Sequence, residues 1–372
     1  MRFEGDRGPW KALLKPSLDW LLLFLPVAVW TEHAQPDSHR LIFVSACLAI
    51  VPLAGMLGIA TEHLAARAGE GLGGFLNATF GNAAELIIAI VALRSGKLDV
   101  VKASLTGSII GNVLLVLGAS FLAGGLRHAV QEYNTLAAQT QTATLSIAAI
   151  ALIIPAAFHN LGEGVVTPEI ERRLSLTIAL MLLAVYSLML VFSLRTHAAL
   201  LSGGENPDGE GGSAHREDLW SVRRAMFSLL GASALIAWMS EILVGSVEQA
   251  AHAMGMSKIF IGLIVVAVVG NAAEHSTAIM MAVKNRLTLS VGIAIGSSTQ
   301  IALFVAPLLV VLSYAIAAVP MDLVFTRGEV LLVVLATFIL SQTTESGTST
   351  WFEGVLLLAV YAICAAAVYC VP

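Results

Sequence analysis

The pentapeptide Gly81-Asn-Ala-Ala-Glu85 recurs letter for letter as Gly270-Asn-Ala-Ala-Glu274, 189 residues further along the chain. At the same offset, Gly107-Ser108 matches Gly296-Ser297 without a gap. These two GNAAE copies lie in apolar surroundings, and a polar stretch separates them. Two copies of one pattern around a central connection indicate an internally duplicated fold.

The composition around the GNAAE copies is typical of a membrane protein. Of 372 residues, 57% are hydrophobic and only 12% are charged, and the mean hydropathy is +0.85. A soluble domain carries about 25% charged residues. The apolar residues form runs of about 20, the length that crosses a bilayer core. We therefore expect the lipid bilayer as a partner and no nucleic acid; a homo-oligomer is left open.

The apolar runs predict an all-α polytopic membrane protein with about 11 transmembrane helices. The expected spans are 17–31, 41–61, 74–95, 102–124, 142–158, 174–194, 224–246, 259–283, 288–313, 328–342 and 352–371. The expected division is an N-terminal segment with an accessory helix (1–33), a first five-helix repeat (40–195), a flexible acidic and Gly-rich linker (196–222) and a second five-helix repeat (223–372). An odd number of spans makes the second repeat enter from the opposite face. Inverted repeats of this kind place their substrate near the membrane midplane.

Basic residues predict the orientation. With the N-terminus in the cytoplasm, twelve Lys and Arg residues fall in cytoplasmic segments and eight on the other side. Cytoplasmic loops are enriched in these residues, so the N-terminus and the linker are expected to be cytoplasmic. The short, untargeted termini favour the plasma (inner) membrane of a prokaryote.

Glu85 and Glu274 each lie inside an apolar segment, with no basic residue within a helical turn. A charge at the bilayer centre costs roughly 2.5–3.5 kcal/mol on insertion scales, so such residues are normally functional. A structural carboxylate paired with Lys or Arg is the alternative, and the sequence offers no nearby partner. The matched pair therefore predicts a transport site.

Oxygen donors surround the two glutamates in the sequence. Asn82 and Asn271 each precede their glutamate by three residues, so amide and carboxylate share a helix face. The glycine before each Asn eases local unwinding, which frees backbone carbonyls as ligands. The next span of each copy adds four polar candidates: Ser108, Asn112, Ser297 and Gln300.

An all-oxygen donor set suits a hard divalent cation. Calcium takes 6–8 oxygen ligands at about 2.3–2.6 Å. Softer metals prefer Cys or clustered His, and only His275 stands beside the site, which keeps zinc or manganese as a less favoured alternative. His275 is also a candidate for proton transfer, because imidazole titrates near neutral pH.

Three further carboxylates, Glu62, Glu241 and Glu248, lie near the ends of predicted helices. Thr61-Glu62 resembles Val247-Glu248 once three residues are skipped, so Glu62 and Glu248 are candidate equivalents in the duplication. They could relay protons or collect cations. Simple exposure to water explains them equally well.

The energetics of the paired glutamates favour exchange over a pore. An occluded site with two ionised carboxylates costs roughly 5–7 kcal/mol on the lower scale. Either one divalent cation or bound protons removes that cost. The cation-loaded and protonated forms can therefore pass between the two open states, while the empty form cannot do so readily. A passive channel and an intramembrane metal hydrolase are the alternatives from other classes. The sequence lacks the His-Glu-x-x-His and Gly-x-Ser-x-Gly patterns of hydrolases.

At these residues the chain resembles the cation/proton exchanger family, the calcium/proton antiporters of the calcium/cation antiporter superfamily. The segments that carry the resemblance are Gly81-Asn-Ala-Ala-Glu85-Leu-Ile, Gly107-Ser-Ile-Ile-Gly-Asn112, Gly270-Asn-Ala-Ala-Glu274-His and Gly296-Ser-Ser-Thr-Gln300. The resemblance implies ten core helices with one accessory helix. It also implies a secondary active antiporter in which Glu85 and Glu274 bind either calcium or protons.

The resemblance further implies that the chain is not an enzyme and needs no cofactor, with Ca²⁺ as cargo and H⁺ as counter-ion. Related sodium/calcium exchangers carry Thr-Ser or Ser-Pro beside the glutamate, where this chain has Asn followed by Ala-Ala. That difference favours protons over sodium. Exchange of sodium, or another monovalent cation, for calcium is the alternative within transport.

Overall fold

The computed structural model describes residues 18–161, 167–197 and 219–370. These residues are almost entirely helical, with one two-stranded ribbon, in which β1 (Gln131–Glu132) pairs antiparallel with β2 (Thr348–Ser349). The first half contains η1 (Leu18–Leu23), α2 (Phe24–Ala34), α3 (His39–Ala68), α4 (Glu70–Phe80), α5 (Ala83–Arg94), α6 (Leu98–Ile110), η2 (Gly111–Val116), α7 (Leu117–Gly125), α8 (Thr135–Leu161), α9 (Pro168–Val191) and η3 (Phe192–Thr196). The second half contains α11 (Val222–Met254), α12 (Lys258–Phe260), η4 (Ile261–Val266), α13 (Ala267–Gly270), α14 (Ala272–Val283), α15 (Leu287–Gln300), η5 (Ile301–Val305), α16 (Ala306–Ile316), α17 (Arg327–Thr343) and α18 (Trp351–Cys370).

Several helices are built to cross a membrane. Seven in the described part of the chain are long and apolar enough, and the bent pair formed by 258–270 and 272–283 makes up to eight. The chain is therefore an integral membrane protein. The remaining helices of the predicted eleven, such as α2 and α17, are shorter, and the full number stays a prediction.

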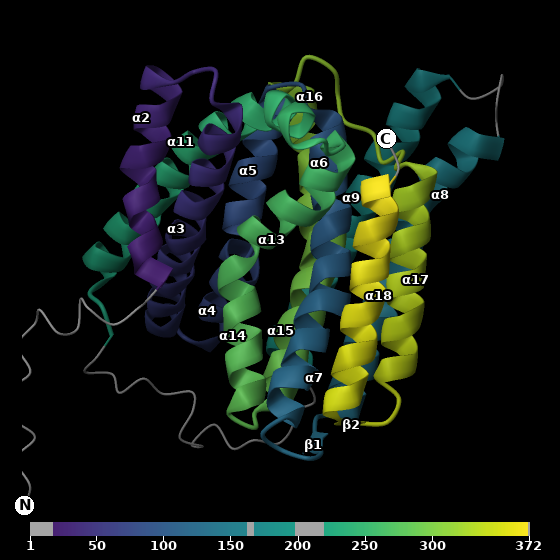
Figure 1. Cartoon of the computed structure of the whole chain (residues 1–372). Helices are drawn as coiled ribbons and strands as arrows, with labels where there is room; N and C mark the ends of the chain where they lie inside the picture. Colours follow the sequence, from purple (N-terminus) through teal and green to yellow (C-terminus); the bar gives the residue numbers. More distant parts are fainter. Residues whose placement is uncertain (1–17, 162–166, 198–218, 371–372) are drawn as a thin grey trace, which may run out of the picture.

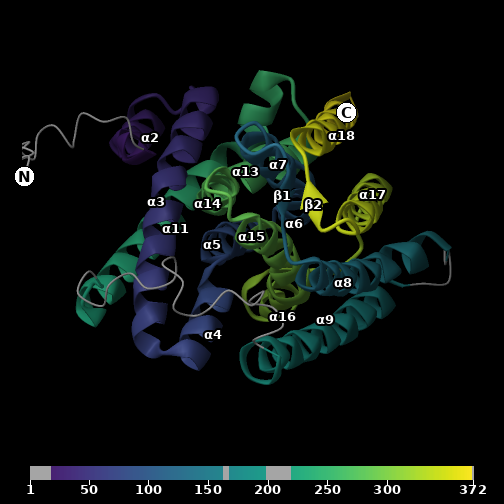
Figure 2. The ribbon, with the colours of Figure 1, turned by 90° about the horizontal axis from the view of Figure 1, so that it is seen from below.

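The helices form two hydrophobic clusters. One consists mainly of α2, α3 and α11 together with one face of α5. The other consists mainly of α6 to α9 and α14 to α18. Figures 1 and 2 show α2, α3 and α11 side by side on one flank, with the broken helices α4–α5 and α13–α14 between the two groups. The candidate site residues belong to this middle region.

The two ends of the bundle differ in their polar contacts. One end, here called the strand end, carries β1 and β2. The other, here called the lysine end, carries the turn before α6 and the start of α12, which contain Lys97 and Lys258. The two ends of the bundle therefore present different chemical groups.

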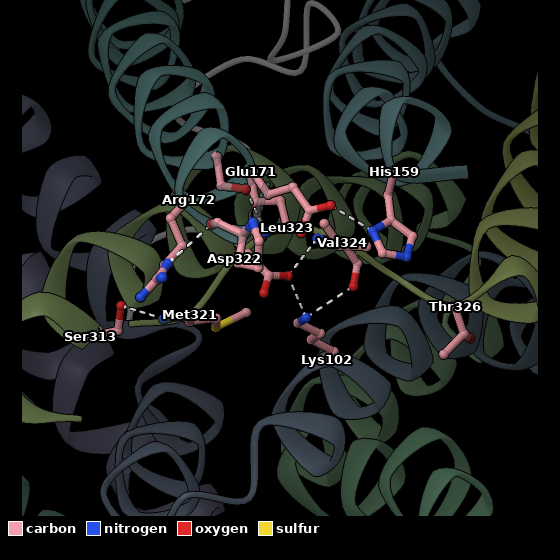
Figure 3. Close-up of polar contacts among 12 residues, drawn as sticks. Lys102, His159, Glu171, Arg172, Ser313, Met321, Asp322, Leu323, Val324 and Thr326 are labelled. Carbon is pink, nitrogen blue, oxygen red and sulfur yellow. Dashed lines mark hydrogen bonds and ion pairs between the residues drawn. The ribbon is translucent and has the colours of Figure 1, made fainter. Parts of the chain in front are cut away.

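The connection between α16 and α17 covers part of the lysine end and is held by hydrogen bonds to Lys102 and Ser175 (Figure 3). The Lys102 ammonium donates to Asp322 Oδ1 at 2.6 Å and to the Val324 carbonyl at 2.9 Å. The Leu323 amide donates to Ser175 Oγ at 2.9 Å. These bonds satisfy backbone groups of a non-helical segment, as membrane proteins require wherever irregular backbone is buried.

The observed helices differ from the expected spans in one division and in two end points. The span expected over 74–95 is two helices, α4 and α5, because the chain leaves helical geometry at Asn82. The spans expected to end at 61 and 246 continue to Ala68 and Met254, since polar residues prolong each helix beyond its apolar run. Most of the expected linker, 198–218, lies outside the described residues, and the division into repeats stays a prediction.

Candidate cation site

Both GNAAE copies interrupt a helix at the same position. Asn82 has φ −95° and ψ 25°, and Asn271 has φ −91° and ψ 5°, so neither residue is helical. A new helix starts at the following alanine in each case. In the second copy the helix axes on either side of the break differ by 62°. The breaks that the glycine and asparagine predict are therefore present.

Each break places its glutamate in the first turn of a helix. Glu85 lies in the first turn of α5 and Glu274 in the first turn of α14. Free backbone N–H groups and the helix dipole favour negative charge there. Glu85 is 7% exposed and interacts electrostatically with Glu274. Two helix starts thus offset part of the cost of holding two carboxylates together in the bundle.

The glycines allow the two copies to approach each other crosswise. A Cβ on Gly81 would lie 3.5 Å from Glu274 Oε1, and a Cβ on Gly270 would lie 3.3 Å from Glu85 Cγ. Each glycine therefore faces the glutamate of the other copy. Residues 189 positions apart form one site.

Side-chain hydrogen bonds also join the two halves. The Asn82 amide donates to Gln300 Oε1 at 2.6 Å, and the Asn271 amide donates to Ser108 Oγ at 2.9 Å. The amide nitrogens are used as donors, which turns the amide oxygens away from those partners. In both copies the asparagine side chain is thus held through its nitrogen atom.

Two further contacts complete the cluster. Ser297 Oγ donates to Glu274 Oε2. His275 Nε2 lies 3.1 Å from Asn112 Oδ1, so the imidazole contacts the amide rather than a carboxylate. The structure thus brings together nine of the predicted site residues: Asn82, Glu85, Ser108, Asn112, Asn271, Glu274, His275, Ser297 and Gln300.

Four oxygens at the centre have no hydrogen-bond partner among the described residues. They are both carboxylate oxygens of Glu85 and the side-chain oxygens Oδ1 of Asn82 and Asn271. Buried polar atoms are nearly always satisfied in proteins, and an unsatisfied acceptor costs about 1–3 kcal/mol. Carboxylate and amide oxygens are also the ligands that hard cations such as calcium bind.

A cavity of ≈ 590 Å³ connects this cluster with the strand end. Its walls include Glu274, Gln300 and Ser297 at the inner end and Thr288 at the outer end. Thr288 Oγ1 accepts a hydrogen bond from the backbone N–H of Asn134, close to β1. Glu62 also lines the cavity, whereas Glu85 does not. The site is therefore approached from the strand end.

The three outlying carboxylates differ from one another. All lie inside α3 or α11 rather than at helix ends, which corrects the expectation. Glu248 is engaged by two lysines, Lys97 at 2.6 Å and Lys258 at 2.8 Å. Glu241 is exposed on α11, and no described hydrogen bond or ion pair joins it to the central cluster. Neither Glu241 nor Glu248 is brought to the site.

Two features of the site were missed by the sequence reasoning. Short π-helical stretches, η2 and η5, follow the site residues of α6 and α15. Such turns are frequent at functional sites, but they have no residue signature. The cavity wall also includes Asn77, Gln141 and Thr277. Thr277 could have been found, because it lies one helical turn after Glu274.

The sodium/calcium exchanger protein family matches residues 39–195 and 224–370, which include both GNAAE copies. The chain belongs to this family. The resemblance drawn from the GNAAE copies is thereby confirmed at the level of the family.

Named relatives support a narrower group within the family. A Ca(2+)/H(+) antiporter of Synechocystis is 43% identical over 365 residues, which cover 95% of this chain and 96% of the relative. One of Aphanothece halophytica is 41% identical over 351 residues, covering 92% and 93%. The solved structure of native YfkE superposes with a TM-score of 0.81 at 37% identity and covers 95% of this chain and 99% of that one. The matched proteins are transporters.

Proposed function

We propose that this family member is a secondary active antiporter that exchanges Ca²⁺ for H⁺ by alternating access. The observation that carries the proposal is the group of four unsatisfied oxygens from Glu85, Asn82 and Asn271, set beside Glu274 in the interior of the bundle. Relatives at 41–43% identity bear the name Ca(2+)/H(+) antiporter. Calcium is the cargo, and no resident cofactor or enzymatic step is part of the proposal.

The ligand set divides into two kinds of oxygen. Glu85 and Glu274 supply charge, while Asn82 and Asn271 supply neutral amide oxygens held in place by Gln300 and Ser108. Calcium accepts irregular shells of 6–8 oxygens, so water from the cavity completes the shell. Ser297 and Gln300 face the same cavity and are the further ligand candidates.

Competition for the two carboxylates couples calcium to protons. One Ca²⁺ or two protons neutralise the pair, and either state avoids burying two like charges. The empty, ionised site is the state that resists closure. Only the neutralised forms switch the side of the membrane to which the site opens. The cycle therefore exchanges calcium for protons across the membrane.

The topology proposed for this cycle has eleven transmembrane helices, two inverted five-helix repeats and the accessory helix α2. Support comes from the two GNAAE breaks, which have matching backbone geometry. Figure 1 shows α5 and α14 leaving their breaks toward opposite ends of the bundle. With the N-terminus cytoplasmic in a prokaryotic plasma membrane, the strand end and its cavity face the cytoplasm. Calcium then enters from inside the cell.

Proteoliposomes separate the candidate counter-ions. Purified protein is reconstituted with a calcium indicator inside, and either a pH gradient or a sodium gradient is imposed. The proposal predicts calcium uptake driven by the pH gradient and abolished in Glu85→Gln and Glu274→Gln. Uptake driven by sodium and indifferent to the pH gradient would instead support sodium/calcium exchange.

A further inference from the structure

Two turns of the chain have the same local structure. Gly96 and Asn285, 189 residues apart, have positive φ of 71° and 60°. The next residues, Lys97 and Arg286, each donate their backbone amide at 2.9 Å to the carbonyl five residues earlier. Each is followed by a leucine that begins the next helix. Lys97 and Arg286 are therefore equivalent positions of the duplication.

The two turns lie at opposite ends of the bundle (Figure 1). Lys97 belongs to the lysine end. Asn285 accepts a hydrogen bond of 2.9 Å from Gln131 of β1, which fixes its turn at the strand end. The duplication thus puts one basic residue, Lys97 or Arg286, at each end.

At the lysine end one carboxylate holds two basic side chains. Glu248 Oε1 accepts from Lys97 Nζ at 2.6 Å and from Lys258 Nζ at 2.8 Å. The ion pairs join α11 to the start of α6 and to α12. Without Glu248 the two ammonium groups would face each other and repel.

Behind these ion pairs α6 and η4 pack closely against each other. A Cβ on Gly107 of α6 would lie 1.9 Å from the Leu263 carbonyl oxygen of η4. A Cβ on Gly262 would lie 2.8 Å from the Ala103 side chain. α6 and η4 are therefore in direct contact at this end, and the cavity beside Leu263 includes none of the nine site residues.

The strand end is in the opposite condition. Glu62, which the sequence aligns with Glu248, lines the cavity and forms no ion pair with Lys or Arg in the described residues. Leu289, in the cavity wall, is 39% exposed, whereas its equivalent Val100 at the lysine end is 3% exposed. Equivalent positions are thus accessible at one end and sealed at the other.

We infer that the two ends carry alternating ion-pair latches. Glu248 binds Lys97 and Lys258 while the lysine end is shut, and Glu62 binds Arg286 when the strand end shuts. The inference rests on alternating access as proposed above. Partly exposed ion pairs are individually weak, which suits a latch that must release in every cycle. Glu62, Glu248, Lys97, Lys258 and Arg286 are positioning residues that bias the two states without contacting the cargo.

Cysteine labelling of the protein in lipid nanodiscs tests the latches without any transport step. The native Cys47, Cys364 and Cys370 are replaced by Ala, and one reporter is added, Val100→Cys at the lysine end or Leu289→Cys at the strand end. The rate of reaction with a charged maleimide measures how often each end is open. Because no calcium or proton flux is recorded, a failure of the latches is distinguishable from a failure of the proposed exchange.

The latch predicts changes of opposite sign at the two reporters. Glu248→Gln should accelerate labelling at position 100 by about two- to tenfold, the range expected for losing two partly exposed ion pairs, and slow it at position 289. Adding Arg286→Gln to Glu248→Gln should reverse both changes in part. The double variant Lys97→Gln/Lys258→Gln repeats the first result without leaving two lysines unpaired.

A matched control breaks an ion pair that takes no part in either proposed latch. Glu169→Gln removes the exposed partner of Arg173 within α9 and should leave both labelling rates unchanged. The inference is overturned if Glu248→Gln leaves position 100 unlabelled, or accelerates both reporters alike, as general loosening would. It is equally overturned if Arg286→Gln adds to the effect of Glu248→Gln.

Discussion

Gly270 packs directly against Glu85, so that a Cβ at position 270 would lie 3.3 Å from Glu85 Cγ. The glycine of the second GNAAE copy thereby sets the position of the glutamate of the first. This distance is shorter than most carbon contacts, and a methyl group there would displace the carboxylate by a few tenths of an ångström. Gly270 thus limits where the charge of Glu85 can lie.

Gly270→Ala is therefore expected to weaken calcium binding without unfolding the protein. Calcium shells need ligands within a narrow distance range, and we expect a loss of about three- to tenfold, or about 0.7–1.4 kcal/mol. Calorimetric titration of the purified protein measures it. Gly58→Ala, in the cavity wall with no atom within 4 Å of the new Cβ, should bind as the unmodified chain does. Equal affinities for both variants would contradict the crosswise arrangement.

The hydrogen bond between Asn82 and Gln300 should appear as energetic coupling. Both side chains belong to one unit, so Asn82→Ala and Gln300→Ala should not be additive, with a coupling of about 0.5–3 kcal/mol. Apparent calcium affinities of the two single variants and the double variant give this quantity. Strict additivity would mean that Gln300 does not orient the Asn82 oxygen toward the cation.

Two variants of His275 distinguish a role in positioning Asn112 from a role in proton transfer. Its Nε2 contacts Asn112 Oδ1 at 3.1 Å. If the contact only positions Asn112, His275→Gln supplies another donor and keeps exchange, whereas His275→Leu leaves a buried acceptor unpaired at a cost of about 1–3 kcal/mol. We expect faster calcium/proton exchange in His275→Gln than in His275→Leu, with the pH profile of exchange in His275→Gln unchanged. A shifted pH profile in that variant would assign the imidazole to the proton path.

The sequence predicted the breaks but not the partners across them. A glycine and an asparagine before an intramembrane glutamate have a local consequence, a helix that stops and restarts, and Asn82 and Asn271 behave accordingly. Which glycine faces which glutamate depends on how two halves pack, and no local pattern encodes it. Glu248 illustrates the same limit, because its partner Lys97 is 151 positions away and belongs to the other half.

Helix lengths were predictable only in part. The apolar runs located the long helices but ended two turns too early at Glu62 and Glu248. Polar residues can continue a helix when neighbouring helices or water satisfy their side chains. The π-helical turns η2 and η5 were equally hidden, because a single extra residue in a helical turn leaves no trace in composition.

Lys102 is expected to stabilise the lysine end. Its side chain is 13% exposed, and its ammonium donates to both Asp322 and the Val324 carbonyl (Figure 3). Lys102→Met removes a charged donor from two acceptors, and we expect a loss of about 1–2 kcal/mol, reduced from the range for charged hydrogen bonds because Asp322 is partly exposed. Thermal unfolding in detergent measures it. Arg173→Gln, which breaks an exposed pair, should leave the midpoint unchanged; an equal loss in both variants would contradict a specific role of Lys102.

Glu85 and Glu274 are proposed to hold either a calcium ion or protons. Adding calcium to purified protein in weakly buffered detergent solution, with a pH indicator, tests it most directly. We predict that calcium releases protons, that the release shrinks as the starting pH rises and the carboxylates ionise beforehand, and that Glu85→Gln and Glu274→Gln abolish it. Calcium binding of full strength with no proton release at any pH, or undiminished release in both variants, would rule out competition between calcium and protons at this pair.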